Sequence, residues 1–174
     1  MNEKIILAFR ANQIKKPLKK SPVTYDTWSP SFREVIPPGK PKRYLIFTLF
    51  NFFRVFHPNR YTLYRAFKNK ELVSSFLVVP AYFKWPFMNK GSVQFTYVMT
   101  SFKHRGKGLA WQGIYKAYVD LKGKGVKEFW YITDSDNIAS QNLARKMGFE
   151  LIGTLEKSNK LFGALKTLKL KHDK

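Results

Sequence analysis

The sequence predicts one α/β or α+β domain built around a mixed sheet. Three observations support this prediction: strand-like stretches come first, a strand–helix–strand–helix order follows, and two strand-like stretches close the chain. The 174 residues suffice to bury a sizeable core, and 44% of them are hydrophobic. The chain has no internal repeat and no interior linker, so we expect a single domain over residues 1–174.

Residues 1–43 are expected to form an irregular, basic, proline-rich arm that packs on the domain. Prolines at this density prevent long regular elements, although a short strand over residues 4–9 fits the sequence. The aromatic side chains of Tyr25, Trp28 and Phe32 would anchor the arm. A partly disordered basic tail is the alternative.

The most hydrophobic stretch, residues 44–56, has the sequence YLIFTLFNFFRVF. It is too short to span a bilayer, which needs about 20 apolar residues. Apolar residues fall on nearly every side, which favours a helix buried in the core or in an interface. A helix lying on a membrane surface, between basic flanks, is the alternative.

The middle of the chain predicts a hairpin followed by an aromatic loop. Residues 60–68 alternate as a strand, Asn69 and Lys70 form a polar turn, and residues 71–81 form the second strand. The next loop, residues 82–87, follows Pro80 and holds four aromatic side chains together with Pro86. Such a loop either borders a binding cleft or forms a hydrophobic lid on the core.

Residues 93–110 organise the second half of the chain. We expect a strand over residues 93–100, a basic glycine-containing turn over residues 103–108, and a helix over residues 109–122. A glycine-rich turn at a helix N-terminus exposes backbone N–H groups, and the helix dipole adds partial positive charge. This stretch therefore predicts an anion site suited to a phosphate or pyrophosphate.

The remaining elements follow at short intervals. A buried strand is expected over residues 127–133, and residues 134–137 supply N-cap chemistry for a helix over residues 138–147. Gly148 ends this helix. Two closing strands are expected over residues 149–156 and 161–170, around a turn at residues 157–160.

The composition limits the chemistry and the partners. Lysine and arginine total 32 against 11 acidic residues, which gives a formal net charge of +21. This charge implies anionic partners: nucleic acid, phosphorylated metabolites or an anionic membrane surface. Cysteine is absent, which excludes disulfides, a thiol nucleophile and thiolate metal sites. No signal peptide is recognisable at the N-terminus, so we expect a cytoplasmic location.

Two motifs in this order resemble the GNAT family of N-acetyltransferases, over about residues 60–170. The first is the family's Gln/Arg-x-x-Gly-x-Gly/Ala turn, which stands here as KHRGKG at residues 103–108. The second is Asn-x-x-Ala/Ser-x-x-Leu-Tyr-x-Lys-x-Gly-Phe, which stands here as NIASQNLARKMGF at residues 137–149. The resemblance implies a GNAT-like mixed, mostly antiparallel central sheet flanked by helices.

The resemblance also implies a site for acetyl-CoA, and no metal. In the family, backbone N–H groups of the first turn hold the pyrophosphate, and the preceding strand end pairs with the pantetheine arm. Asn137 would contact the coenzyme, with Ser140 and Lys146 nearby. The implied coenzyme-binding residues are Val98, Met99, Thr100, Lys103, His104, Arg105, Gly106, Lys107, Gly108, Leu109, Ala110, Asn137, Ser140 and Lys146.

Two departures from the family pattern concern catalysis. Ala144 stands where the family often has a tyrosine that protonates the leaving thiolate. The sequence between Glu71 and Asp120 has no carboxylate, so the family's frequent glutamate base is missing from the strand. The catalytic candidates are Tyr97 and His104, with His57, Asp134 and Asp136 as further candidates. The alternative for His104 is a solvent-facing neighbour of the phosphates. The alternative for Tyr97, His57 and Asp136 is a structural role. Catalysis would then rest mainly on positioning and a favourable field.

Three functions are compatible with these residues. The first is an acyl-CoA-dependent N-acetyltransferase that acts on an amine acceptor, such as a nucleotide-linked amino sugar or another small anionic or aromatic amine. The second is a non-catalytic acyl-CoA-binding module of the same fold. The third is a basic nucleic-acid-binding protein, supported by charge alone. Under the first function we expect no specific nucleic acid, and residues 44–56 could serve a homodimer.

Overall fold

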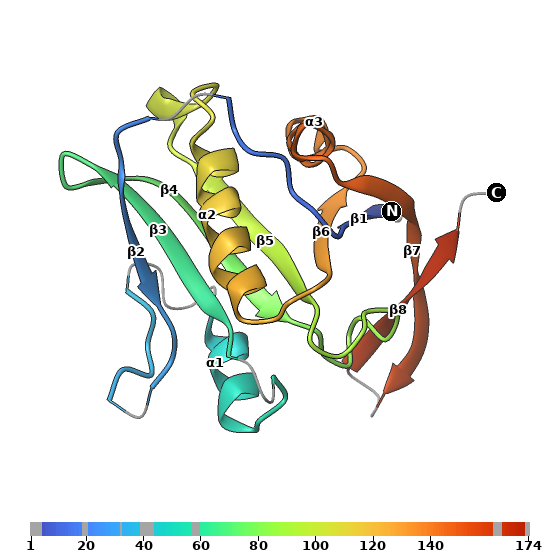
Figure 1. The fold of residues 1–174 in the computed structure, drawn as a ribbon. Helices are drawn as coiled ribbons and strands as arrows, with labels where there is room; N and C mark the ends of the chain where they lie inside the picture. The colour runs from blue at the N-terminus through green and yellow to red at the C-terminus, as the bar shows by residue number, and fades with distance from the viewer. Residues whose placement is uncertain are drawn as a thin grey trace.

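An eight-stranded sheet runs through the chain, in the order β2-β3-β4-β5-β6-β1-β7-β8 (Figure 1). The computed structural model describes residues 5–18, 21–31, 33–38, 44–56, 60–161 and 165–172. The strands are β1 (Ile6–Ala11), β2 (Thr24–Trp28), β3 (Thr62–Lys68), β4 (Glu71–Pro80), β5 (Val93–Thr100), β6 (Phe129–Asp134), β7 (Glu150–Leu161) and β8 (Leu165–His172). The helices are α1 (Leu45–Phe52), α2 (Leu109–Gly123) and α3 (Ile138–Met147), with a short 3₁₀ turn η2 (Phe102–His104).

The strand pairing confirms the mixed, mostly antiparallel sheet. Neighbouring strands pair antiparallel everywhere in the described part of the sheet except between β5 and β6, which run parallel. Helix α2 supplies the crossover between these two strands, as a parallel pair requires. The single parallel pair is the feature around which the candidate site is built.

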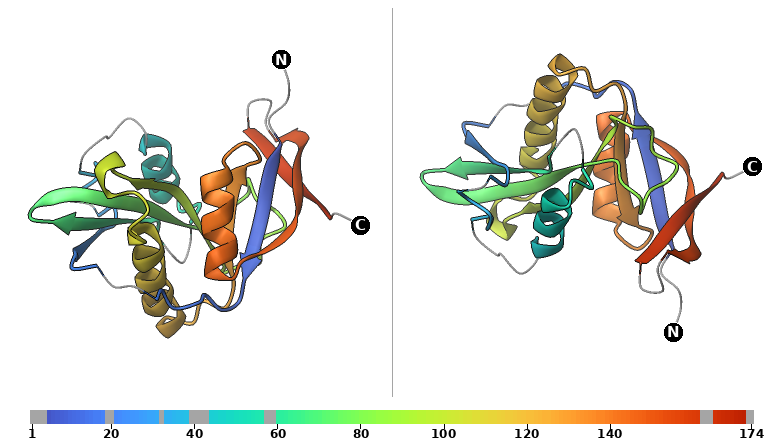
Figure 2. Two further views of the ribbon diagram at one scale, coloured as in Figure 1. Left: turned by 90° about the horizontal axis from the view of Figure 1, so that it is seen from above. Right: turned by 90° about the horizontal axis from the view of Figure 1, so that it is seen from below.

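The sheet has a different cover on each face. Helices α2 and α3 pack on one face, where Phe76 and Val78 of β4 belong to the same core cluster as Ile114 and Met147. The alternate β4 residue Leu77 points to the other face and packs beside α1. Figure 2 shows α1 and α2 on opposite sides of the β3–β4 hairpin.

Two stretches of residues 1–43 form strands: β1 agrees with the short strand that fits residues 4–9, and β2 departs from the expected irregular arm. Strand β1 pairs with both β6 and β7 in the interior of the sheet, and β2 forms an edge beside β3. The prolines of the arm lie outside both strands, so neither ladder loses an N–H donor. Ala8 and Phe9 are fully buried, which is what fixes β1 in the core. Trp28 is buried as an anchor, whereas Phe32 lies outside the described residues.

Two turns decide the hairpins. The β3–β4 hairpin is confirmed, and its turn residues Asn69 and Lys70 both have positive φ, as a two-residue type I′ turn requires. The expected turn at residues 157–160 is wrong, because β7 and β8 continue to pair as far as Leu161 and Leu165. A register shift between Lys157 and Lys160 absorbs the irregular sequence inside the ladder.

Helix α1 is shorter than the apolar stretch that predicted it. It covers Leu45–Phe52, with Phe47 and Thr48 buried against the sheet. Several of its large apolar side chains stay exposed on the opposite side, so the expected burial holds for one side only. None of the helices in the described part of the chain has the length and apolar character needed to cross a membrane.

Candidate functional site

Strands β5 and β6 separate partway along their length, and this separation defines the candidate site. Their parallel ladder has only three registered pairs, and it ends at Phe95 and Tyr131. Strand β5 nevertheless continues to Thr100 and β6 to Asp134. The facing edges of both continuations therefore lack a strand partner, and Figure 1 shows the two strands diverging between α2 and α3. An extended ligand can add to such edges through main-chain hydrogen bonds.

A β-bulge in β5 lies directly beside this divergence. Leu77 of β4 pairs with Thr96 and Ser75 pairs with Met99, so β5 has one residue more than β4 over this interval. Tyr97 has a φ of 51°, which is the left-handed region that a bulky residue rarely adopts. The bulge bends the strand and takes one residue out of the ladder, which explains why β5 turns away from β6.

The turn after β5 presents unused backbone donors to open space. Gly106 and Gly108 both have a φ of 74°, which glycine adopts without steric cost. Among the described residues, apart from its two chain neighbours, no heavy atom lies within 4 Å of where a Cβ on Gly106 would stand. In the described structure, the N–H groups of Gly106, Lys107 and Gly108 donate to no acceptor, and the first turn of α2 adds further free N–H groups. This is the geometry of an anion cradle.

Cations surround the cradle, as expected from the sequence. Lys103, Arg105 and Lys107 are exposed on the turn, and the Nζ of Lys107 donates to the Lys103 carbonyl at 3.0 Å. The guanidinium of Arg105 lies over the Phe102 ring, 5.4 Å from its centroid. His104 is half-buried, with Nδ1 2.9 Å from the Ser101 hydroxyl. The turn therefore combines free N–H groups with positive charge, and it carries no carboxylate.

Two residues that the sequence analysis missed fix this turn from the side. The N–H of Ser21 donates to Oε1 of Gln112 at 2.8 Å, and the Ser21 hydroxyl donates to the Lys107 carbonyl at 3.4 Å. Gln112 is buried in the first turns of α2. Ser21 belongs to the arm, so only the tertiary structure shows that the arm supports the cradle.

Helix α3 faces the same divergence from the β6 side. Asn137 is its N-cap, and Oδ1 accepts a hydrogen bond from the Ser140 N–H at 3.1 Å. This confirms the expected capping role; contact with a coenzyme stays a prediction. Lys146 is exposed near the other end of the helix. Ala144 is fully buried in the core, and its methyl group offers no proton donor to the site.

Tyr131 carries a hydroxyl group that was not among the catalytic candidates predicted from the sequence. It stands on β6 at the last parallel pair, and its phenol donates to the Ser140 hydroxyl at 3.4 Å. Burial raises the pKa of Tyr131, although the hydrogen bond with Ser140 opposes this effect. The phenol is therefore protonated at neutral pH. A signal was present in the sequence, because a tyrosine interrupts an otherwise apolar strand.

The other face of the sheet brings an aromatic group to the bulge. The ring of Tyr97 lies 5.9 Å from the rings of both Tyr44 and Phe47. The loop after β4 packs on α1 through Tyr82, whose ring centroid is 5.8 Å from that of Phe50. Burial raises the pKa of Tyr82, and the neighbouring Tyr97 phenol acts in the same direction. The aromatic loop therefore lies next to the bulge, and it also covers part of the core.

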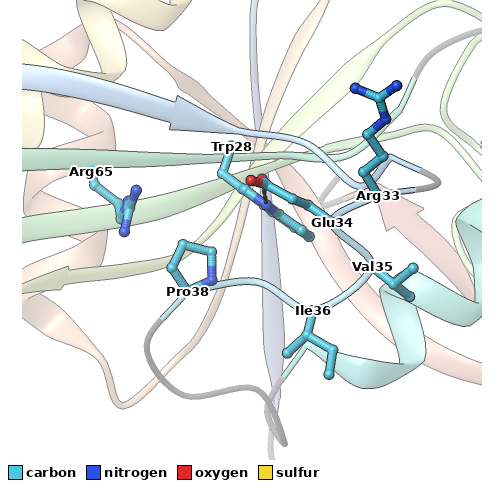
Figure 3. Close-up of a pocket in the computed structure, with 7 residues that line it drawn as sticks. All are labelled: Trp28, Arg33, Glu34, Val35, Ile36, Pro38 and Arg65. Atoms are coloured by element: carbon cyan, nitrogen blue, oxygen red, sulfur yellow. Dashed lines mark hydrogen bonds between the residues drawn. The ribbon is translucent and has the colours of Figure 1, made fainter.

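A cavity of about 650 Å³ opens on the α1 face near β2 and β3. Figure 3 shows the indole of Trp28 donating to the Glu34 carboxylate, with Arg33 and Arg65 on either side. Arg65 forms an ion pair with Asp26, and its Nε is buried without an acceptor in the described structure. The other lining residues are Val35, Ile36 and Pro38.

The sheet connects this cavity with the bulge. Arg65 is in register with Ser75 of β4, and Ser75 is in register with Met99 of β5. Since neighbouring strands lie about 4.8 Å apart, the backbones of Arg65 and Met99 are about 10 Å apart. A ligand that contacts both would therefore need to be elongated, with a length of about 10 Å.

The structure separates the catalytic candidates. Tyr97 lies at the bulge, His104 lies in the anion turn, and no direct contact joins them among the described residues. Asp134 ends β6, and Asp136 lies in the loop before α3. His57 lies outside the described residues. In the part of the chain that the structure describes, histidines and carboxylates form no cluster that could hold a metal ion.

Solved structures share this fold at low sequence identity. An IAA acetyltransferase from Bacillus cereus matches with a TM-score of 0.54 and 12% identity over 84% of this chain and 94% of that chain. A GCN5-related N-acetyltransferase from Sphaerobacter thermophilus matches with a TM-score of 0.56 and 15% identity over 85% of this chain and 48% of that chain. AAC(6')-Iy, solved with the bisubstrate analog CoA-S-monomethyl-acetylneamine, matches with a TM-score of 0.51 and 16% identity over 80% of this chain and 96% of that chain.

Some matched structures are longer than this chain, and a family model matches most of its sequence. The chain spans about three fifths of the length of two further matched structures. No curated protein sequence matches the chain. A family model described as "Acetyltransferase (GNAT) family" matches residues 22–149, so the family pattern begins well before residue 60, where the resemblance was expected to start. This match covers most of the chain, including the arm from Pro22 onward and both motifs, and the chain therefore belongs to the GNAT acetyltransferase family.

Proposed function

We propose that this protein transfers an acetyl group from acetyl-CoA to a primary amine. The observation that supports this proposal best is the early end of the β5–β6 ladder directly above a glycine cradle with free N–H groups. A linear ligand with an amide-rich arm and a pyrophosphate matches both features: the arm adds to the strand edges, and the pyrophosphate occupies the cradle. The residues implied by the resemblance, from Val98 to Ala110, run from the end of β5 through the cradle to the start of α2, which supports the proposal.

The reaction proceeds by direct attack. The amine nitrogen forms a bond to the thioester carbon, the C–S bond breaks, the thiolate takes a proton and the amine loses one. A bulge leaves backbone groups outside the ladder, and a free N–H near Tyr97 would stabilise the developing oxyanion. The amine approaches from the α1 face, where the Tyr97 ring is partly exposed. His104 lies in the turn before the cradle, so we propose that it neighbours the coenzyme phosphates and not the thioester.

Tyr131 would take the role of the tyrosine that the family often has at the position of Ala144. It lies at the apex of the divergence, it is protonated at neutral pH, and its hydroxyl already takes part in a hydrogen bond with α3. A phenol at this place can protonate the leaving thiolate and can be reprotonated by solvent through the half-buried Ser140.

The acceptor combines an amine with an anionic or aromatic group. The Arg33 guanidinium supplies positive charge that the described residues leave unpaired, and Trp28, Val35 and Ile36 supply apolar contact. With the amine at the bulge, an anionic group about 10 Å away reaches this cavity. A nucleotide-linked amino sugar has both features.

A non-catalytic acyl-CoA-binding module is the second candidate. It is favoured by the burial of Ala144 and by the missing carboxylate on β5, because both leave the active site without the family's usual proton donors and acceptors. The two candidates share coenzyme binding and differ in turnover.

Calorimetry with coenzyme A and a thiol-release assay separate the outcomes. The proposal expects coenzyme A binding and release of free thiol from acetyl-CoA when a panel of amines includes amino-sugar nucleotides. Binding without thiol release on any amine would favour the binding module. Absence of coenzyme A binding would contradict both candidates.

A further inference from the structure

Helix α1 has an apolar outer surface. Leu45, Ile46, Leu49 and Phe53 are exposed by 46% to 78%. At about 100° per residue, these four side chains fall within a single sector about 100° wide on the outer side of the helix and its C-cap. We call this set the α1 apolar face. A surface helix normally shows polar residues on this side.

The inner side of the same helix packs on the protein core and includes a polar residue. Phe47 packs on Phe56 and Tyr61, with ring centroids 6.3 Å and 5.9 Å away. The buried hydroxyl of Thr48 lies 2.7 Å from the Tyr61 hydroxyl, within hydrogen-bonding distance. The helix therefore buries a threonine side chain, while leucine, isoleucine and phenylalanine side chains on its outer side are exposed. A contiguous exposed apolar group of this kind marks an interaction surface.

The chain segment that carries this face is rich in lysine and arginine. Between residues 35 and 70 the sequence has eight lysines and arginines and no aspartate or glutamate. Arg54 is exposed and follows Phe53 directly. Arg60 is exposed nearby in the chain, with its guanidinium bound to the Pro30 carbonyl at 3.1 Å. The segment that carries the apolar face is therefore basic and has no carboxylate of its own, and Arg54 follows the face directly.

Charge decides which occupant fits this face. A second copy would bring another net charge of +21 and another basic segment, and the two surfaces would repel. An anionic lipid surface offers an apolar layer for the leucine and phenylalanine side chains and negative headgroups for the cations. It complements both properties of the face at once.

We propose that the α1 apolar face docks the protein on an anionic lipid bilayer. The four side chains insert at the boundary between headgroups and acyl chains, and the surrounding cations contact the headgroups. The helix lies on the surface and does not span the bilayer. Docking on this side uses none of the residues assigned to coenzyme binding, so the inference does not rest on the proposed coenzyme site.

Vesicle co-sedimentation of the full chain tests this inference. The vesicles are phosphatidylcholine alone and phosphatidylcholine mixed with phosphatidylglycerol. The test variant is Leu49→Gln with Phe53→Gln. The matched control is Leu18→Gln with Val119→Gln, which removes two exposed apolar side chains elsewhere, and thermal melts establish that both variants are folded.

The inference expects the parent and the control to bind the mixed vesicles, and the test variant to bind at least about 10-fold more weakly. Binding to phosphatidylcholine alone is expected to be much weaker for all three. Equal binding of test variant and parent would overturn the inference, because net charge alone would then explain it. A dimer in sedimentation velocity that the test variant abolishes, without vesicle binding, would assign the face to a second copy.

Discussion

The Gly106→Leu substitution tests the anion cradle with a close internal control. Gly106 has a φ of 74° and Gly91 has a φ of 85°, and a Cβ on either residue would meet no heavy atom within 4 Å. A non-glycine residue in this region costs about 1–2 kcal/mol. Because one kcal/mol shifts the melting temperature of a chain of this size by about 2–4 °C, each leucine variant should melt about 2–8 °C lower.

Only Gly106→Leu should affect coenzyme binding. Its side chain would occupy the space in which the pyrophosphate is proposed to lie, and would cost one or two hydrogen bonds to a charged group at about 1.5–3 kcal/mol each. The Kd for coenzyme A in calorimetry should rise about 10- to 100-fold or more, whereas Gly91→Leu should leave it within about twofold. Equal affinities for the two variants would refute the cradle.

Three further predictions follow from the same structure. Tyr131→Phe should lower kcat about 10- to 100-fold with little change in KM for acetyl-CoA, as measured by thiol release; an unchanged kcat would remove Tyr131 from the reaction. Gly113→Ala should lower the melting temperature despite the better helix propensity of alanine, because the new Cβ would stand 2.9 Å from Cε1 of Phe76; a rise would show that β4 yields easily. Burial raises the pKa of Tyr64 to about 12, so its contribution to stability is complete below pH 10 and declines as pH rises toward 12; denaturant unfolding of Tyr64→Phe should show a weaker decline there than the parent, and parallel curves would contradict this assignment.

Local patterns predicted the elements that have strong local signals. The alternation in residues 60–81 and the Asn69–Lys70 turn define the β3–β4 hairpin without tertiary information. The glycine turn and the helix after it are equally local, because positive φ at Gly106 and Gly108 is a property of glycine. The anion cradle could therefore be predicted, together with the family to which the chain belongs.

The parts of the fold and of the site that depend on long-range contacts could not be predicted from the sequence. Strand β1 pairs with residues about 120 to 150 positions away, and nothing within residues 1–43 specifies those partners. The early end of the β5–β6 ladder depends on a bulge at Tyr97, and a tyrosine with positive φ has no sequence signature. The Ser21–Gln112 hydrogen bond and the hydroxyl contact between Tyr131 and Ser140 likewise join segments that only the folded sheet brings together.

The exposed side of α1 shows a different limit. The composition of residues 44–56 predicted a helix with apolar residues all round, and such a helix is normally buried. The sheet has room to cover only one side of it, since Phe47 and Thr48 already contact the cluster around Tyr61. Which side stays exposed is decided by the position of β3 and β4 and not by the helix sequence.

Amide hydrogen exchange with and without coenzyme A tests the central claim most directly. The site predicts slower exchange for the N–H groups of residues 106–110 in the cradle, and for residues 96–100 along the free edge of β5. Residues 74–78 of β4, which lie between β3 and β5 in the sheet, should change little. Protection confined to other segments at saturating coenzyme A, or no protection at all, would contradict a coenzyme site between β5 and β6.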